Sequence, residues 1–187
     1  MKGWIILCIM IAFASAGNWM NNGTFESELS VGWQQQGSSG ATFTRAINYD
    51  PDPDYEVQVY KGPGSGYAHL YQSVSFECPV SDLNFSINAK MWAYDNNADT
   101  LCWAASAVIV SYMNSSGTKL GDTRICMKTT PCPWVSTSTI HLINVSDSLW
   151  HSYNFNIATE LGNLPGVNPA NVRRIQIALY DTTAHTC

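Results

Sequence analysis

Residues 83–94 read LNFSINAKMWAY, and the alternation in this stretch decides the predicted fold. One set of alternate residues is apolar: Leu83, Phe85, Ile87, Ala89, Met91 and Ala93. The other set is polar or aromatic: Asn84, Ser86, Asn88, Lys90, Trp92 and Tyr94. Successive side chains of a β-strand point to opposite faces of the sheet, so this period of two predicts a strand with one face on the core. One-sided strands of this kind are typical of antiparallel sheets.

The same period recurs along the rest of the chain. It predicts strands at VQVY (57–60), LYQSVSF (70–76), STIHLI (138–143), HSYNFNI (151–157) and RRIQIALY (173–180). Residues 101–113, LCWAASAVIVSYM, are apolar on both sides and predict a central strand covered on both faces. Turn-forming segments lie between these strands, and only residues 158–163 could hold a helical turn. We therefore expect an all-β fold, an antiparallel β-sandwich, with the jelly roll as the favoured version.

The N-terminal segment has the order of a secretory signal peptide. Residues 1–16 contain one Lys, an apolar run over residues 4–13, and Ala-Ser-Ala at 14–16. A membrane span needs about 20 apolar residues, so this run is short for one. We expect cleavage after residue 16, with an uncleaved anchor as the alternative. Residues 17–187 then form a single domain that is secreted, either extracellular or at the cell surface.

Charge excludes two classes of partner. Only 12% of the residues are charged, and the formal net charge is −5. Nucleic acids are bound by basic faces, and anionic lipid surfaces attract clusters of Lys and Arg. We therefore expect no nucleic-acid partner and no membrane contact beyond the signal segment.

The cysteines are expected in a compartment that permits disulfides. Cys126 and Cys132 flank the short loop MKTTP and are the expected pair, and Cys78 with Cys102 is a second possible pair. Sequence alone does not fix the connectivity. The count after cleavage is odd, so Cys187 is the candidate for an unpaired thiol or for an intermolecular bridge.

Four sequons are candidate glycosylation sites: Asn22, Asn84, Asn114 and Asn144. Chance explains such sequons too, because Asn, Ser and Thr are common in this chain. In an exported protein they predict glycans on the surface.

Several segments, taken in order, resemble carbohydrate-binding modules of the CenC type (families four, nine and twenty-two), and more broadly the galactose-binding-like jelly roll. The segments are NGTFE…GWQ (22–34), GYAHLYQSVSF (66–76), LWHSYNFNIATEL (149–161) and NVRRIQIALYD (171–181). The resemblance spans nearly all of the chain after the signal. It implies a non-catalytic module that holds glycan chains, with NNGTFE as its first strand and Gly32-Trp33 in its second.

The resemblance also implies a structural calcium ion near the first strand, where Glu26 matches the acidic residue of the family. The family usually adds an Asp from a final strand, whereas this sequence ends at DTTAHTC, where that strand would follow. A domain lacking its last strand has an open sheet edge, and open edges recruit strands from other chains. Separately, Asp50, Asp52 and Asp54 alternate with prolines in an oxygen-rich loop that suits calcium. A solvated acidic turn explains the same pattern.

A sugar site needs flat aromatic faces and polar groups that bond to hydroxyls. The expected carbohydrate-binding residues are Trp92, Tyr94, Asn88, Lys90, Gln72 and Trp134. The first four share the outward face of residues 83–94, and Trp134 lies in the PCPW loop, where it would line a rim. The alternatives are that Trp92 packs under a loop or at an edge and that Gln72 is simply solvated.

Catalytic motifs are absent from the sequence: G-x-S-x-G, H-E-x-x-H and the P-loop. A glycosidase needs two carboxylates across a cleft, and nothing in the sequence selects such a pair. We expect a secreted, non-catalytic module that holds a polysaccharide or glycan on an aromatic sheet face, with a glycosidase or lyase left open. The alternative is a structural extracellular or cell-surface filament subunit of the same fold that assembles by strand donation.

Overall fold

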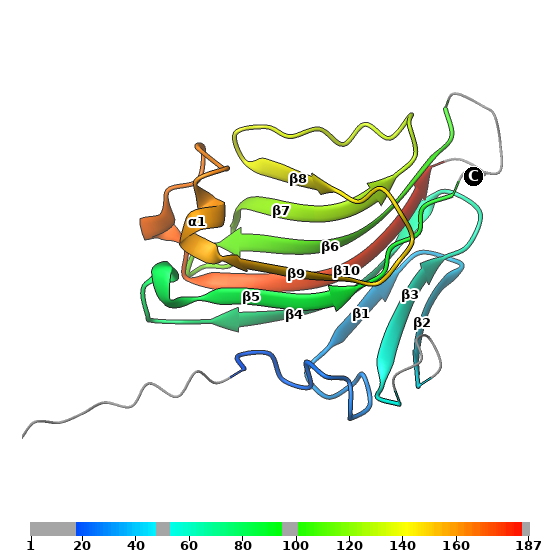
Figure 1. Ribbon diagram of the computed structural model, residues 1–187, viewed down its shortest axis with the longest axis horizontal. Helices are drawn as coiled ribbons and strands as arrows, with labels where there is room; N and C mark the ends of the chain where they lie inside the picture. The colour runs from blue at the N-terminus through cyan, green and yellow to red at the C-terminus, as the bar shows by residue number, and fades with distance from the viewer. Residues whose placement is uncertain (1–17, 48–52, 95–100, 185–187) are drawn as a thin grey trace, which may run out of the picture.

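The computed structural model describes residues 18–47, 53–94 and 101–184, and these residues form an almost entirely β-structure (Figure 1). The strands are β1 (Gln34–Gly37), β2 (Ala41–Ala46), β3 (Glu56–Lys61), β4 (Gly66–Ser75), β5 (Asn84–Ala89), β6 (Trp103–Met113), β7 (Lys119–Lys128), β8 (Ile140–Asn144), β9 (His151–Asn156) and β10 (Arg174–Ala184). The helical elements are η1 (Val80–Asp82), α1 (Ile157–Leu161) and η2 (Pro169–Asn171). The predicted all-β class is confirmed. No helix in the described part of the chain is long and apolar enough to cross a membrane.

A six-stranded sheet forms one layer, in the order β1-β4-β10-β6-β7-β8. Its pairs are antiparallel except β7 with β8, which run parallel. The predicted central strand is β6, which lies between β10 and β7 and is buried along most of its length. Residues 181–184 continue β10 in the interior of the sheet. The prediction that a further strand is missing stays a prediction.

The second layer is split into two antiparallel sheets of two strands each, β2 with β3 and β5 with β9 (Figure 1). β5 and β9 pack on one part of the inner face of the six-stranded sheet. Val57 and Val59 of β3 pack around Leu70 of β4, together with Leu29 and Trp33, on another part of that face. The two layers therefore form a β-sandwich whose second layer is not continuous across the described residues.

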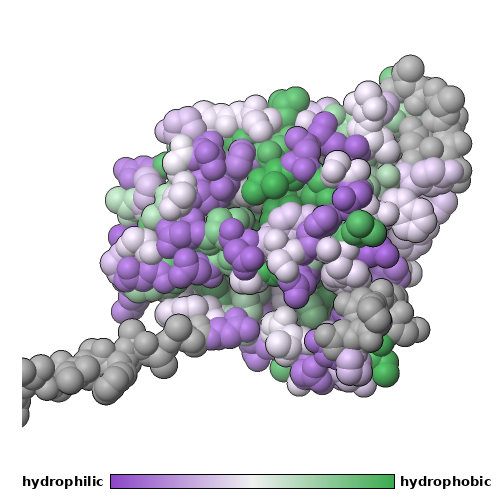
Figure 2. Space-filling model, in the orientation of Figure 1, coloured by the Kyte–Doolittle hydropathy of each residue, from purple (hydrophilic) through white to green (hydrophobic). Residues whose placement is uncertain are grey.

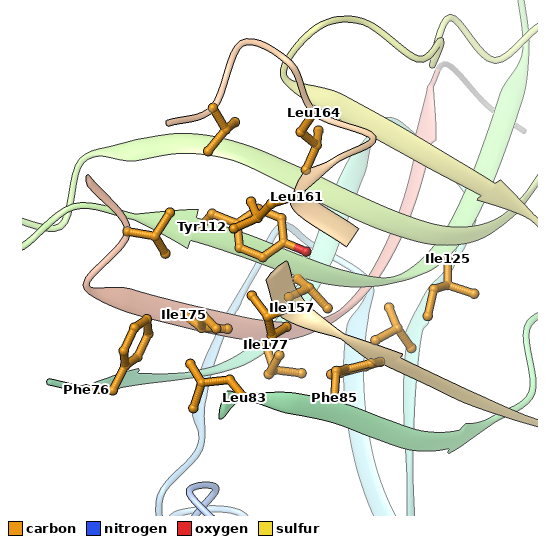
Figure 3. Close-up of a cluster of buried hydrophobic side chains, with 14 of the residues drawn as sticks. Phe76, Leu83, Phe85, Tyr112, Ile125, Ile157, Leu161, Leu164, Ile175 and Ile177 are labelled. Atoms are coloured by element: carbon orange, nitrogen blue, oxygen red, sulfur yellow. The ribbon is translucent and has the colours of Figure 1, made fainter. Parts of the chain in front are cut away.

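Most of the core lies between β5–β9 and the large sheet. Figure 3 shows Ile175 and Ile177 of β10, Phe85 of β5 and Tyr112 of β6 converging with side chains of α1. The predicted alternation of residues 83–94 is confirmed, because Phe85 of the inward set is 8% exposed and Trp92 of the outward set is 70% exposed.

A buried polar cluster fastens α1 to the large sheet. Glu160 of α1 is 5% exposed, and its Oε1 accepts a hydrogen bond from Thr123 Oγ1 at 2.7 Å. The same oxygen lies 2.5 Å from His141 Nδ1, and Oε2 accepts from Asn163 Nδ2 at 3.0 Å. Tyr112 Oη completes the cluster at 3.1 Å from Thr123 Oγ1. Buried polar groups are tolerated when they are paired in this way.

The predicted strand at NNGTFE is wrong, and so is the placement of Gly32-Trp33 in a strand. Residues 20–32 form turns and bends, and the first strand begins at Gln34. Asn22 and Phe25 have positive φ values of 51° and 58°, a conformation that ends strand geometry. Asn22 Oδ1 also accepts a hydrogen bond from Ser27 N–H at 2.9 Å, which closes the turn.

Besides β1, two strands were not predicted from the sequence. β2 contains the alternating residues ATFTRA, and β7 contains KLGDTRICMK. In β7, charged residues alternate irregularly with apolar ones. Asp122 is completely buried, and this burial is tolerated because Arg124 and Lys119 form ion pairs with its carboxylate. The apparent polarity of this segment therefore reflects buried ion pairs rather than a loop.

Candidate functional site

The outer face of the six-stranded sheet carries a group of aromatic rings. Tyr67, His69 and Tyr71 alternate along β4 with residues whose side chains enter the core, such as Leu70, which is completely buried. Tyr180 lies on the neighbouring strand β10, whose Leu179 faces inward. All four rings are only partly buried. A continuous hydrogen-bonded sheet therefore supports them as one rigid surface.

The rings lie close enough to form a single platform. The ring centroids of His69 and Tyr71 are 4.5 Å apart at an interplanar angle of 20°, and those of Tyr67 and Tyr180 are 6.0 Å apart at 17°. The His69 ring meets the Tyr180 ring edge-on at 5.6 Å. Trp134 adds a fifth ring, 6.2 Å from that of Tyr180. We call these five residues the aromatic face.

The loop after β7 holds Trp134 in this position. Thr129 N–H donates to the Ala104 carbonyl at 3.0 Å, and Ala104 N–H donates to Thr129 Oγ1 at 2.9 Å. The guanidinium carbon of Arg124 lies 4.6 Å from the centroid of the Trp134 ring. Arg124 is itself fixed, because its Nε donates to Asp122 Oδ1 at 3.0 Å. Trp134 thus combines a cation–π contact with a loop anchored to the sheet.

Amide side chains border the aromatic face. Gln34 and Gln36 of β1 are exposed and are paired in register with Tyr71 and His69 of β4. Gln176 of β10 is half-buried and lies on the same side of its strand as Tyr180. Amides both donate and accept hydrogen bonds, so they suit the hydroxyl groups of a sugar.

Two ionisable side chains of the aromatic face, those of His69 and Tyr180, have shifted pKa values. Burial lowers the pKa of His69, and the positive charge of Lys119 lowers it further. Burial raises the pKa of Tyr180. At neutral pH both side chains are therefore uncharged, and each offers a donor and an acceptor.

The predicted residues Trp92 and Tyr94 lie on the other side of the molecule. They are 70% and 62% exposed, so the alternative that Trp92 packs under a loop is wrong. Their rings lie 6.5 Å apart. Figure 2 shows the face with β5 and β9, where hydrophilic side chains predominate and hydrophobic ones are exposed in scattered groups.

Trp92 and Tyr94 line a groove between β3 and the segment that follows β5. The groove has a volume of about 510 Å³. We call it the Trp150 groove and define it by Tyr60, Lys90, Trp92, Tyr94, Ser106 and Trp150. Residues of β6 and β10, including Asp181, form part of its wall. The predicted site residues are therefore divided, with Trp134 on the aromatic face and Trp92, Tyr94 and Lys90 in the groove.

Two other predicted contacts have structural partners. Gln72 is 6% exposed, and its side-chain amide makes two hydrogen bonds to the backbone of Asn21. Asn21 N–H donates to Gln72 Oε1 at 2.6 Å, and Gln72 Nε2 donates to the Asn21 carbonyl at 2.8 Å. The interpretation of Gln72 as a solvated or sugar-binding residue is wrong, because its polar atoms hold the N-terminal segment. Asn88 is exposed on β5, and its Oδ1 accepts from Ser152 Oγ at 2.6 Å.

The calcium prediction stays a prediction. Glu26 and Asp54 are exposed, whereas Asp50 and Asp52 lie outside the described residues. Within residues 18–47, 53–94 and 101–184, no group of three or more His, Cys, Asp or Glu could hold a metal ion.

The predicted disulfide pairs are wrong. Cys78, Cys126 and Cys132 are free, so neither Cys126–Cys132 nor Cys78–Cys102 is formed. Cys102 is in a disulfide bond, and its partner is none of these three cysteines. Burial raises the pKa of Cys126 to about 11 and also raises that of Cys132, which keeps both thiols protonated. Cys187, the predicted unpaired cysteine, lies outside the described residues.

The sequons differ in accessibility. Asn84 and Asn144 are exposed, as attachment of a glycan requires. Asn22 is less suitable, because its Nδ2 donates to the carbonyls of Ser27 and Glu28 at 3.0 and 3.2 Å. Asn114 is half-buried, and its Oδ1 accepts from Thr118 N–H at 2.8 Å. Glycosylation itself stays a prediction.

We expect the free energy of unfolding to depend on the ionisation of Asp181, which lies in the wall of the groove. Burial raises its pKa to about 6, from an ordinary value of 3.8, although Lys61 N–H donates to its Oδ2 at 2.7 Å. The folded state therefore binds this proton more tightly than the unfolded state. The stability that this provides is complete below about pH 4 and is lost as the pH rises through about 6.

We expect Asp181→Asn to remove this loss. The neutral amide keeps an acceptor for Lys61 N–H, so at pH 7.5 the variant should be about 2 kcal/mol more stable than the wild type. At pH 4 the two should be equally stable. Urea unfolding at both pH values measures the difference, and equal stabilities at pH 7.5 would show that Asp181 carries no raised pKa.

No protein-family model matches the sequence, and no curated protein matches it. Among solved structures, the chain is similar to the enzymatically active domain of tailspike protein 4 of bacteriophage CBA120, with 13% identity and a TM-score of 0.48. That match covers 89% of this chain but only 20% of the tailspike chain.

The chain is also similar to carbohydrate-binding modules. A module of the β-sandwich superfamily, described as having promiscuous specificity, is 12% identical with a TM-score of 0.43, over 93% of this chain and 58% of the other. The family 11 module of the cellulosomal cellulase Lic26A-Cel5E of Clostridium thermocellum is 14% identical with a TM-score of 0.42, over 91% and 94%. Similarity at such low identities and TM-scores gives no information on the residues of the functional site. The CenC type that the sequence segments suggest stays a prediction.

Proposed function

We propose that the protein is a non-catalytic module that binds a polysaccharide or another glycan across its aromatic face. The observation that carries the proposal is the set of five neighbouring rings, from β4, β10 and the loop after β7, on one sheet face. Aromatic rings offer flat apolar surfaces to the C–H faces of sugar rings. The rings follow one another across two strands and a loop, so the face suits a chain of several sugars.

The polar residues at the edge of the face support the same function. The exposed amides of Gln34 and Gln36 can bond to hydroxyl groups beside the rings. His69 and Tyr180 remain uncharged at neutral pH, and this suits a neutral ligand. The described residues of the face include no pair of carboxylates across a cleft, which glycoside hydrolysis would use.

Export and calcium belong to this proposal as well. The signal-like segment and the acidic residues Asp50 and Asp52 lie outside the described residues, so both rest on the sequence. A secreted glycan-binding module would meet its polysaccharide outside the cell.

Retention on immobilised polysaccharides tests the function. Residues 17–187 are passed through gels containing β-1,4-glucan, mixed-linkage β-glucan, xylan, mannan or chitin derivatives, with calcium or with a chelator. We expect saturable retardation on at least one polymer, and loss of that retardation with the chelator only if calcium is structural. A folded protein that is retarded by none of these polymers would contradict the proposal.

A further inference from the structure

The Trp150 groove has the features of a second ligand site, separate from the aromatic face. Its volume of about 510 Å³ lies within the usual range of small-ligand pockets. It adjoins a second cavity of about 670 Å³, because Trp150, Ser106 and Met91 line both. Both cavities lie where the second layer is split between β3 and β5.

Aromatic rings stand at the mouth of this groove. Tyr60 of β3 is 49% exposed, and Trp92 and Tyr94 on the opposite side are 70% and 62% exposed. Large rings left in water on both sides of a groove are available to a ligand that buries them. Lys90 on the same side is also exposed and supplies a charged donor.

Two polar atoms inside the groove have no partner. The Nε1 of Trp150 and the Oγ of Ser106 are buried, and neither makes a hydrogen bond within the described residues. Such an unpaired buried group costs about 1–3 kcal/mol, so its presence calls for an explanation. A ligand oxygen would accept the Trp150 N–H, and a ligand hydroxyl would pair with Ser106.

We propose that the Trp150 groove binds the end of a glycan chain as a mono- or disaccharide unit. Aromatic rings at the mouth would stack on the sugar, and the unpaired groups inside would bond to its hydroxyls. Ser106 and Asp181 lie opposite each other on the inner face of the sheet, whereas Tyr180 lies on the outer face. The two sites therefore occupy opposite sides of the six-stranded sheet. The groove does not require the aromatic face in order to bind.

Two variants separate this site from a merely structural groove. Ser106→Ala removes an unpaired buried hydroxyl, so it should leave the free protein at least as stable while lowering its affinity for the sugar about fivefold. Trp92→Ala removes an exposed ring, so it should lower the affinity about tenfold with little change in the midpoint of thermal unfolding. Leu149→Ala is the matched control, because Leu149 is 64% exposed and lines neither cavity.

The test is a titration of the ¹⁵N-labelled protein with cellobiose, xylobiose, mannobiose and chitobiose. The tryptophan indole N–H signals are followed, and that of Trp150 is assigned by its absence in Trp150→Phe. We expect saturable displacement of the Trp150 signal by at least one disaccharide, weaker in Ser106→Ala and Trp92→Ala and unchanged in Leu149→Ala.

Tyr71→Ala distinguishes the two sites. It should weaken retention on the polysaccharide while leaving the Trp150 signal responsive. The inference is overturned if none of the four disaccharides displaces the Trp150 signal, or if the displacement is unaffected by both groove variants. Self-association that Trp92→Ala abolishes would instead assign the groove to a strand from a second copy, and it would also overturn the glycan assignment.

Discussion

We expect Tyr180→Ala to weaken the binding of the retained polysaccharide at least about tenfold, or about 1.4 kcal/mol. Tyr180 lies at the centre of the aromatic face, because its ring neighbours those of Tyr67, His69 and Trp134. Its removal takes away one stacking surface and leaves the neighbouring rings without lateral support. Calorimetric titration with oligosaccharides of the retained polymer measures the loss.

Tyr180→Phe is the matched control for this change. It keeps the ring and removes only the hydroxyl, so its affinity should fall less than threefold if stacking dominates. Circular dichroism must show both variants to be folded. If Tyr180→Ala binds as tightly as the wild type, the aromatic face is not where the polysaccharide lies.

We expect Glu160→Ala to cost about 3–4 kcal/mol of stability. The substitution would leave Thr123 Oγ1, His141 Nδ1 and Asn163 Nδ2 without their shared acceptor, in a region where Glu160 itself is 5% exposed. It would also loosen α1 from the large sheet. Urea unfolding measures the change in the free energy of unfolding.

Glu160→Gln should lose clearly less, because the amide oxygen still accepts from Thr123. Glu77→Ala, at an exposed glutamate, should change stability by less than about 0.5 kcal/mol. A Glu160→Ala variant within about 1 kcal/mol of the wild type would show that the buried cluster does not fasten α1.

Most strands with one face in the core could be predicted from sequence. Residues 83–94 show this, since Phe85 and Met91 are buried while Trp92 is exposed. The central strand β6 could be predicted because it is apolar on both sides. The turns of residues 20–32 could not, because positive φ at Asn22 and Phe25 depends on local hydrogen bonds that no periodicity reveals. β7 could not be predicted because charged residues interrupt its apolar pattern, and one of them, Asp122, is buried in ion pairs.

The aromatic face was within reach of the sequence but was missed. The alternation that places Leu70 in the core also places Tyr67, His69 and Tyr71 on the opposite face, and the same holds for Tyr180 opposite Leu179. What periodicity does not give is strand order. β4 and β10 are more than a hundred residues apart in places, and only their pairing brings the rings together. Strand order is also needed to predict that Trp134 and Trp92 lie on different sides of the molecule.

The most direct test of glycan binding on the aromatic face is a titration of aromatic-ring NMR signals with the oligosaccharide of the retained polymer. We predict that the signals of Tyr67, His69, Tyr71, Trp134 and Tyr180 shift together and saturate at one common affinity. Binding on the aromatic face would be contradicted if these five residues stayed unperturbed while the oligosaccharide bound elsewhere on the folded protein.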